Sequence, residues 1–547
     1  MLIGRITLAS NRVGEIVLLK FPYSDYKGSK MRPAVILSAE GGFENDFTVA
    51  YVTSVFDKYS PSPYSITFGP NDLESGQIKK PSLIRVDKVA VVDQDSFFKD
   101  NVAKLGIEKI KELISRWAQL VATNYYKSIH LPAQTQPFDP EKSRVFYAGR
   151  VFDENEMVKL VDSSLDFWLT EGRYSEEFSE KIADFLDAEN VFLTNSGSSS
   201  NLLAISALTS KKLGDRRLIP GDEVITAAAG FPATVTPIIQ NNLIPVFVDV
   251  DIPTYNINID ALRKAISPKT KAIFLAHTLG NPFDVEAVVK IAREHNLWLI
   301  EDNCDAFGSQ YNGKYTGTFG DISTISFYPA HHITTGEGGA VVTNNDELGK
   351  IIKSFRDWGR DCYCAGGENN TCGKRFTQQL GTLPYGYDHK YVYSEIGYNL
   401  KMTEMSAAIG SAQMDKLEMF CDQRRDNFKH YSKELADYTK YLILPEATQN
   451  SDPAWFTYII SVKEEAPFTR NELVTHLNDN RIETRNIFAG NMIRQPAFMD
   501  QKYRVAGQLT NTDFIMNSTF FLGTFPGMNN EKIEYTAEVM KRFMDRF

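Results

Sequence analysis

An alternation of strand-like and helical runs between residues 190 and 343 most constrains how this 547-residue chain can fold. Strands that alternate with helices predict a mainly parallel sheet with helices packed on it, which is an α/β architecture. From about residue 376 the chain becomes helix-rich, and strand and helix pieces near 455–547 suggest a smaller C-terminal subdomain. The predicted strands are residues 190–194, 222–226, 244–250, 271–276, 297–301, 321–328 and 340–343.

The first 120 residues have a different pattern. Runs rich in branched residues are followed by a segment from Ile107 in which apolar residues recur at helical spacing, and this predicts a small β-barrel-like domain closed by one helix. Residues 123–150 contain turn residues of mixed polarity, so we expect a linker there. The predicted strands of this domain lie at 14–20, 33–38, 48–55, 64–68 and 82–92.

Composition and charge exclude several classes of protein. The chain is 43% hydrophobic, enough to form real cores. It has no apolar run of the roughly 20 residues that a membrane span needs, and its start lacks the pattern of a secretory signal. We therefore expect a cytoplasmic enzyme without a membrane partner. Residues 1–125 carry 16 Lys+Arg against 14 Asp+Glu, a net charge of +2, whereas the whole chain carries −10.

Two segments have residue types that suit a phosphorylated cofactor. Residues 194–201 form a Ser- and Gly-rich turn between a strand and a helix, where backbone N–H groups can bind phosphate. Such a turn is by itself more often only a helix cap. The second segment places two carboxylates, Asp302 and Asp305, at the end of a buried strand.

The cysteines suggest a metal site. Cys304 is followed by 57 residues, Cys362, one residue, Cys364, seven residues and Cys372. Four thiolates suit either structural zinc or an iron–sulfur cluster, and spacing alone favours zinc as the commoner case. Because Cys304 lies between two carboxylates of the candidate cofactor segment, a redox cluster is the better interpretation. We expect Cys421, which stands apart, to be a buried apolar residue.

The loop from Ser326 to Ala340 resembles the lysine loop of vitamin-B6-dependent sugar aminotransferases. The fifth residue after the serine is the cofactor-binding lysine in that family, but here it is His331, and no lysine occurs between Lys314 and Lys350. An imidazole cannot form an imine, so the covalent anchor is lost.

This resemblance implies a type I, aspartate-aminotransferase-like fold with a seven-stranded, mainly parallel sheet and a small C-terminal subdomain. It also implies roles for individual side chains. Asp302 would pair with the pyridine nitrogen and Asp305 would face the phenolic oxygen of the cofactor. The other implied cofactor-binding residues are Gly197, Ser198 and Ser326 at the phosphate, Phe231 stacked on the ring, and Asn399 reaching the phosphate of a neighbouring subunit in a homodimer.

The histidine and the cysteines together resemble the CDP-4-keto-6-deoxy-D-glucose 3-dehydrase family of 3,6-dideoxyhexose (lipopolysaccharide) biosynthesis. Matching segments begin at Ser163, Leu275 and Arg356, and the likeness runs from about Tyr147 to the C-terminus. It implies a CDP-sugar substrate, pyridoxamine 5′-phosphate, and an NAD(P)H-dependent iron–sulfur flavoprotein reductase as partner. It also implies a 2Fe–2S cluster bound by Cys304, Cys362, Cys364 and Cys372.

In that family the histidine of the loop removes the methylene proton of the cofactor, which assigns this role to His331. Tyr328 and Glu337 are candidate helpers, and His332 is assigned a structural role. Three alternatives remain: a sugar aminotransferase, which lacks its lysine here; a cluster-free GDP-sugar 3-dehydrase, which would not need four cysteines; and a ribonuclease toxin whose C-terminal part is only a carrier.

The N-terminal segment resembles the PemK/MazF toxin family of endoribonucleases, with an SH3-like β-barrel. The matching pieces start at Gly14, Met31, Tyr51 and Pro81. The resemblance implies metal-free RNA cleavage by Arg32 and Thr53, with RNA as a possible partner. The expected domains are residues 1–122 (toxin-like), 123–150 (linker and entry segment), 151–375 (cofactor-binding, with the iron–sulfur cysteines) and 376–547 (helical return and small subdomain).

Overall fold

The computed structural model describes residues 12–22, 29–38, 46–56, 62–364 and 368–547. The chain divides into two compact units, one of residues 1–136 and 153–167 and the other of residues 137–152 and 168–547. Among the described residues no helix is both long enough and apolar enough to cross a membrane.

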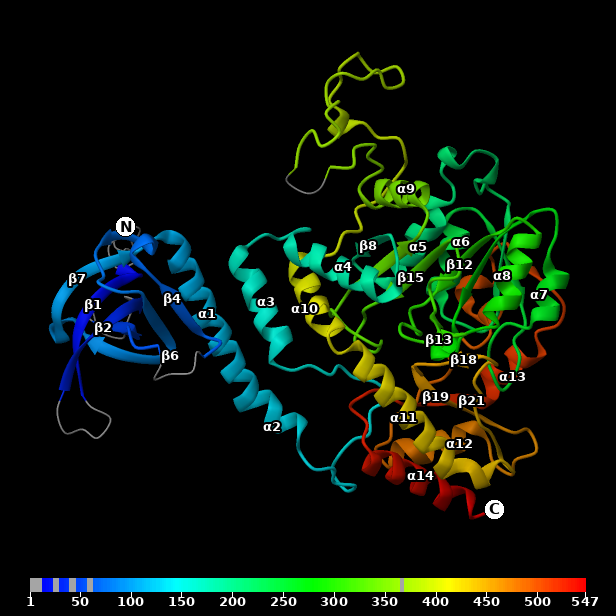
Figure 1. The fold of residues 1–547 in the computed structure, drawn as a ribbon. Helices are drawn as coiled ribbons and strands as arrows, with labels where there is room; N and C mark the ends of the chain where they lie inside the picture. The colour runs from blue at the N-terminus through cyan, green and yellow to red at the C-terminus, as the bar shows by residue number, and fades with distance from the viewer. Residues whose placement is uncertain (1–11, 23–28, 39–45, 57–61, 365–367) are drawn as a thin grey trace, which may run out of the picture. The chain divides into compact units, whose positions relative to one another are not determined.

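The first unit contains a curled antiparallel sheet of seven strands in the order β4-β6-β3-β2-β1-β7-β5 (Figure 1). This confirms the expected small β domain, and it adds two strands, β5 and β7, whose mostly exposed residues give little apolar signal. The strands are β1 (Glu15–Pro22), β2 (Ser29–Ser38), β3 (Asp46–Thr53), β4 (Ser65–Phe68), β5 (Leu73–Gly76), β6 (Ser82–Asp93) and β7 (Phe97–Leu105).

Helix α1 (Ile107–Tyr125) covers this sheet with its apolar side, where Leu113 is buried among the strand residues. A second helix, α3 (Glu154–Asp166), packs on α1. Both Ser115 Oγ and Gln119 Nε2 donate hydrogen bonds to Asp162 Oδ1, at 2.7 and 2.9 Å. The first unit is therefore stabilised by a helix that follows the expected linker.

The segment assigned to the linker is helical over its first half. After α1, a π-helical turn (Tyr126–His130) leads into α2 (Leu131–Gln134). Tyr126 is buried, and its hydroxyl donates to Gln134 Oε1 at 3.0 Å across the turn.

The second unit is built on an eight-stranded sheet in the order β20-β10-β9-β11-β12-β15-β16-β8. Strands β20 to β15 are parallel neighbours, and β16 runs antiparallel between β15 and β8. The seven expected strands are present, which confirms the type I fold. They are β8 (Asn190–Thr194), β9 (Glu223–Ala227), β10 (Ile244–Val248), β11 (Thr270–Ala276), β12 (Trp298–Asp302), β15 (Ile322–Ser326) and β16 (Gly339–Thr343), and β20 (Arg504–Val505) is added at one edge.

Helices cover both faces of this sheet. Successive residues of β11 are buried in opposite clusters, since Phe274 packs with α5 and α9 while Ile273 and Leu275 pack with α7 and α8. Burial on both faces explains why these strands are continuous apolar runs. The helices of this region are α4 (Arg173–Leu186), α5 (Gly197–Ala207), α6 (Pro232–Gln240), α7 (Ile259–Ala265), α8 (Val285–Glu294) and α9 (Asp346–Arg356).

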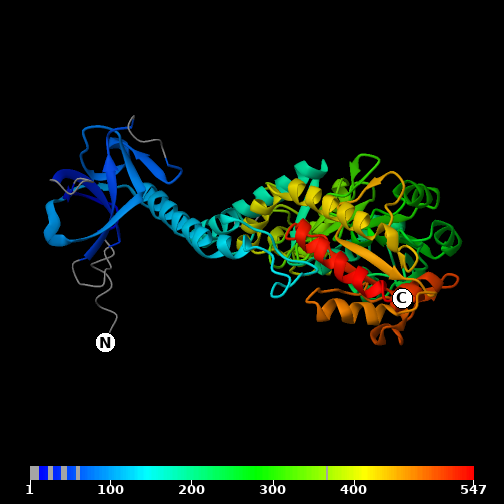
Figure 2. The ribbon, with the colours of Figure 1, turned by 90° about the horizontal axis from the view of Figure 1, so that it is seen from below.

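The C-terminal part forms the smaller subdomain, in which α14 lies beside α11 (Figure 2). Its own core joins these helices to a three-stranded sheet, β17-β19-β21. The elements are α10 (Glu404–Met414), α11 (Leu417–Leu435), β17 (Leu442–Ile443), β19 (Thr457–Val462), α12 (Arg470–Asp479), α13 (Thr510–Ser518), β21 (Thr519–Gly523) and α14 (Asn530–Met544), with a second small sheet of β13 (Gln310–Tyr311), β14 (Lys314–Tyr315) and β18 (Ser451–Asp452).

A buried carboxylate fixes the end of β12. Glu301 is fully buried, and its carboxylate accepts hydrogen bonds from the amides of Gly317, Phe319 and Gly320 at 2.9, 2.8 and 2.6 Å. The ring nitrogen Nε2 of His277 lies 3.0 Å from the same carboxylate. One side chain thus joins the end of β12 to the loop before β15 and to the residue after β11.

The surroundings of Glu301 favour its charged form. Burial alone would raise its pKa, but the hydrogen bond and charge of His277, together with the amides of Gly317 and Gly320, lower the pKa below its ordinary value. The next residue along β12 is Asp302, so this network also fixes the position of the expected cofactor-binding carboxylate.

We predict that Glu301→Ala lowers the free energy of unfolding of the second unit by about 3–5 kcal/mol, because a buried histidine and three amides lose their partner. The depressed pKa means that this contribution is present above about pH 4.5 and is lost as the pH falls through the folded-state pKa. Urea unfolding at pH 7 and pH 4 measures both effects. Glu286→Gln, an exposed residue of α8, is the control, and equal midpoints for Glu301→Ala and wild type would contradict the prediction.

Candidate functional site

A cavity of about 520 Å³ lies where several strands of the large sheet end. This volume is within the usual range of small-molecule sites. Its walls come from the turn before α5, the start of α6, the ends of β11 and β12, the loop after β15, and the C-terminal subdomain. The expected site residues that line it are Gly197, Ser198, Phe231, Asp302, Cys304, Asp305, Ser326, Tyr328, His331 and Glu337.

The residues that we expect to bind phosphate, Gly197 and Ser198, lie at the N-terminus of α5. Ser196 is the N-cap and accepts a hydrogen bond from the Ser199 amide, so the helix begins at Gly197 beside the cavity. A Cβ atom at residue 197 would overlap the Ser326 side chain, so glycine is required for this close approach. Amides of a first helical turn have no intrahelical acceptor and can bind an anion.

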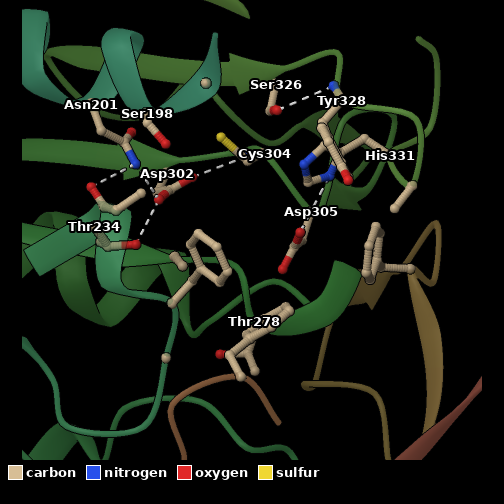
Figure 3. Close-up of a pocket in the computed structure, with 18 of the residues that line it drawn as sticks. Ser198, Asn201, Thr234, Thr278, Asp302, Cys304, Asp305, Ser326, Tyr328 and His331 are labelled. Carbon is tan, nitrogen blue, oxygen red and sulfur yellow. Dashed lines mark hydrogen bonds and ion pairs between the residues drawn. The ribbon is translucent and has the colours of Figure 1, made fainter. Parts of the chain in front are cut away.

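Asp302 is held rigidly at the cavity wall (Figure 3). Its Oδ2 accepts hydrogen bonds from Asn201 Nδ2 at 2.8 Å and from the Thr234 hydroxyl at 2.7 Å. Thr324 in turn donates to the Asn201 side-chain oxygen at 2.5 Å, which fixes the orientation of that amide. Asn201 lies in the Ser- and Gly-rich segment noted above, but only the folded sheet shows that Asn201 and Thr234 hold Asp302.

His331 lies on the opposite side of the cavity and faces Asp305. Its Nδ1 is 3.4 Å from Asp305 Oδ1, and its backbone carbonyl accepts a hydrogen bond from Arg424 at 3.1 Å. The ring packs against Phe456, with the centroids 5.3 Å apart, and Tyr328 stands edge-on to it. Burial raises the pKa of Asp305, an effect that the neighbouring His331 opposes. The carboxylate expected at the cofactor's phenolic oxygen is thus the partner of His331 in this structure.

The adjacent His332 points into the protein interior. Its Nε2 is 2.5 Å from the Ala454 carbonyl oxygen, so this nitrogen carries the hydrogen of a neutral ring. Burial lowers the pKa of His332 well below its usual value, and the positive charge of Arg424 adds to this. His332 does not line the main cavity, so its position agrees with the expected structural role.

Two aromatic groups at the cavity mouth come from segments that the sequence alone did not connect. Phe231 is half-exposed and meets Phe488 edge-to-face, with the centroids 5.2 Å apart. The Arg485 guanidinium lies over the Tyr147 ring at 4.1 Å. Phe488, Arg485 and Tyr147 were missed because each lies at least 50 residues from the nearest predicted site residue along the chain.

The four cysteines expected to share one cluster are divided between two places. Cys304 lines the main cavity, where burial and then the Asp302 carboxylate raise the pKa of its thiol well above the usual value. Cys362, Cys364 and Cys372 line a separate small cavity after α9. The structure therefore does not bring Cys304 to the other three. The physical reason is that Cys304 directly follows β12 and is fixed at the sheet, whereas the other three lie on the long connection from α9 to α10.

The local environment of two of these thiols favours the thiolate. A hydrogen bond from Thr371 is the main cause that lowers the pKa of Cys364 to about 7, and a hydrogen bond with His389 lowers the pKa of Cys372. Burial raises the pKa of Cys362. Across the described residues, no group of three or more His, Cys, Asp or Glu side chains is already arranged around one metal position. As expected, Cys421 is buried.

Asn399 lies outside the cavity. It is exposed at the junction before α10, where Lys401 Nζ donates to its side-chain oxygen at 3.0 Å. Its expected contact is with the phosphate bound by a neighbouring subunit, and its exposed position leaves it accessible to one.

In the first unit, Arg32 and Thr53 lie on neighbouring strands. Ala34 of β2 pairs with Tyr51 of β3 in antiparallel register. Arg32 lies two residues before Ala34 on β2, and Thr53 lies two residues after Tyr51 on β3. Thr53 Oγ1 accepts a hydrogen bond from the Val55 amide at 3.2 Å. Burial raises the pKa of Tyr51, and the charge of Arg32 acts in the opposite direction, which shows that the two are close. The two expected residues of this domain therefore lie near the same end of two neighbouring strands.

Comparison with known proteins finds a family match in both units. Residues 152–541 match the DegT/DnrJ/EryC1/StrS aminotransferase family, and residues 12–121 match the PemK-like, MazF-like toxins of type II toxin–antitoxin systems. The second match identifies the first unit as carrying a PemK/MazF-like domain.

Individual relatives agree with the first match. The chain is 54% identical to the lipopolysaccharide biosynthesis protein RfbH of Salmonella typhimurium over 80% of its own length and 97% of that protein. It is 48% identical to dTDP-4-dehydro-2,6-dideoxy-D-glucose 3-dehydratase of Saccharopolyspora spinosa, over 76% of its length and 90% of that protein. Among solved structures, E. coli GDP-4-keto-6-deoxy-D-mannose-3-dehydratase with bound hydrated PLP superimposes with a TM-score of 0.65 at 30% identity, covering 73% of this chain and all of that one.

Proposed function

The chain belongs to the DegT/DnrJ/EryC1/StrS aminotransferase family, and on this premise we propose that it is a nucleotide-sugar 3-dehydratase of dideoxysugar (lipopolysaccharide) biosynthesis. The observation that carries the proposal is the histidine in the cavity. His331 stands at the position of the cofactor-binding lysine, and no lysine is present among the described residues that line the cavity. A transaminase needs that lysine, whereas relatives named 3-dehydratases share this fold.

The residues of the cavity fit pyridoxamine 5′-phosphate. The start of α5 with Ser326 would bind the phosphate, Phe231 would stack on the ring, and Asp302 would pair with the pyridine nitrogen. Such a cofactor supplies an amine that condenses with a ketone and a ring that withdraws electrons. Because Asn201 and Thr234 both donate to Asp302, this carboxylate stays in place without the cofactor.

His331 is the group that would move the proton. Asp305 beside Nδ1 and Phe456 against the ring fix the imidazole, so its Nε2 is free to take a proton from the cofactor's methylene carbon. Removal of this proton would allow the hydroxyl group at carbon 3 of a bound 4-ketosugar to leave. We propose CDP-4-keto-6-deoxy-D-glucose as the substrate. The alternatives are a GDP- or dTDP-linked sugar and a cluster-free enzyme.

Completion of the reaction requires two electrons. We propose that they arrive singly from an NAD(P)H-dependent iron–sulfur flavoprotein through a 2Fe–2S cluster. The support is the set of three cysteines around one small cavity, two of them with lowered pKa values. We also propose that the protein is a homodimer in which the exposed Asn399 reaches the phosphate bound by the neighbouring subunit.

We expect His331→Asn to bind pyridoxamine phosphate but to lose exchange of its methylene proton with solvent by at least 10²-fold, because the amide is not a base. Proton exchange is measured by NMR of the bound cofactor. His331→Lys should permit covalent attachment of pyridoxal phosphate that borohydride makes permanent. His295→Asn, which changes an exposed histidine, is the control. Exchange at the wild-type rate in His331→Asn would reassign the base to Tyr328.

For the cluster, we predict two iron and two acid-labile sulfide per chain in protein purified without oxygen. Cys364→Ser should lose the iron and the visible chromophore but still catalyse the dehydration half-reaction, since that step needs no external electron. Cys421→Ala is the control because Cys421 is buried elsewhere. Stoichiometric zinc without sulfide would refute the iron–sulfur part of the proposal.

A second activity is proposed for the PemK/MazF-like domain, namely endoribonuclease cleavage by Arg32 and Thr53. The observation that favours it is that Arg32 and Thr53 lie near the same end of the neighbouring antiparallel strands β2 and β3. A guanidinium can stabilise the charge that develops on a phosphate during cleavage, and the threonine hydroxyl can position the 2′-oxygen.

We expect the full-length protein to cleave single-stranded RNA without metal, and Arg32→Ala to lower the rate by about 10²–10³-fold, since a single stabilising donor is worth that much. The readout is fragment formation from a labelled RNA in EDTA. Arg116→Ala, an exposed arginine of α1, should cleave like wild type. Absence of cleavage by the wild-type protein would leave this domain without the proposed activity.

A further inference from the structure

We propose that Arg424 is a positioning residue for proton transfer by His331, because it holds both the loop that carries this histidine and the residue that packs on its ring. Arg424 lies on α11 of the C-terminal subdomain and is 1% exposed, so its guanidinium is inside the protein. The role in proton transfer rests on the proposed function, whereas the hold on the loop can be tested without that function.

Arg424 is an unpaired charge in the core. Among the described residues, no carboxylate forms an ion pair with its guanidinium, and its Nε atom is buried without a hydrogen-bond partner. Burial lowers the pKa of Arg424 to about 10, so the group still carries its charge at neutral pH. Burying a charge without a partner of opposite sign costs free energy that an apolar side chain would not. Stability of the core alone therefore does not account for this arginine.

The guanidinium joins two segments that meet at the catalytic ring. Its Nη2 donates to the His331 carbonyl oxygen at 3.1 Å. Its Nη1 donates to the carbonyl oxygens of Phe456 and Trp455 at 3.0 and 3.3 Å. The rings of His331 and Phe456 pack together with their centroids 5.3 Å apart. One buried side chain thus fixes the backbones of the two residues whose rings are in contact.

The loop that carries His331 depends on support from outside. Residues 328–338 contain no helix or strand, so regular backbone hydrogen bonds do not fix them. Besides Arg424, two side-chain contacts tie the loop to the C-terminal part of the chain: His332 Nε2 is 2.5 Å from the Ala454 carbonyl oxygen, and the Thr334 amide donates to Gln413 Oε1 at 3.2 Å. Of these three contacts, only that of Arg424 acts at residue 331 itself.

Arg424 acts on the chemistry only through His331. It is not among the described residues that line the cofactor cavity, so it would touch neither cofactor nor substrate there. The rate of a proton transfer depends on where the base stands relative to the carbon that loses the proton, and a misplacement of about 1 Å can cost about 10²-fold. Loosening the backbone at residue 331 should therefore slow proton transfer more than it weakens cofactor binding.

The first measurement compares Arg424→Met and Arg424→Lys in the full-length protein. We expect Arg424→Met to bind pyridoxamine phosphate as tightly as wild type, because Arg424 does not line the cavity. At saturating cofactor, NMR should show exchange of the methylene proton slowed by about 10²-fold. Arg424→Lys, which keeps a charged donor at this place, should recover most of that loss. Arg542→Met, which removes an exposed arginine of α14, is the control and should exchange like wild type.

The second measurement needs no enzymatic activity. Deuterium uptake of backbone amides, followed by mass spectrometry, should rise for residues 328–338 in Arg424→Met and stay unchanged for β11, which also shows that the variant is folded. If Arg424→Met fails to fold, Arg424→Gln, which keeps donors without the charge, takes its place in both measurements.

Equal deuterium uptake of the loop in the variant and in wild type would overturn the inference, as would wild-type proton exchange in a variant whose loop is loosened. In either case the proposed function would stand. Absence of proton exchange in the wild-type protein would instead refute the proposed function, and the deuterium comparison would then still decide whether Arg424 holds the loop.

Discussion

The buried carboxylate of Glu301 is the interaction on which the geometry of the cavity depends. A charge in the interior is tolerated only if it is fully paired, and here three amides and His277 provide that pairing. Those partners come from the loop before β15 and from the residue after β11, so the ends of β11 and β12 are fixed relative to the start of β15. Asp302 follows Glu301, so the carboxylate that we expect to face the cofactor is also held in a fixed position.

The sequence was sufficient to predict the strands that are buried on both faces. Strands such as β11 and β12 are continuous apolar runs because helices pack on both sides, and they were predicted to within a residue or two. Strand β20 has two residues and β5 is mostly exposed, so neither carries a periodic signal. A periodic sequence pattern reflects which residues are buried, so a strand that buries few residues cannot be predicted from such a pattern.

The site was predicted where its residues are local in sequence and missed where they are not. The turn before α5, the Asp302 segment and the His331 loop are short motifs. The contacts that hold them, such as Asn201 and Thr234 to Asp302, join residues 68 to 101 positions apart. The cysteine spacing suggested one four-thiolate site, but spacing does not record that Cys304 is attached to a strand while the other three are on a long connection.

Helix α3 lies within the family match of one unit but packs in the other unit. The match to the aminotransferase family begins at residue 152, yet α3 is grouped by its packing with the toxin-like unit, where Asp162 accepts from Ser115 and Gln119. A protein trimmed at the family boundary would therefore keep α3 but remove the helix on which it packs. The boundary between the two family matches therefore differs from the boundary between the two compact units, and a stable fragment must be cut at the second.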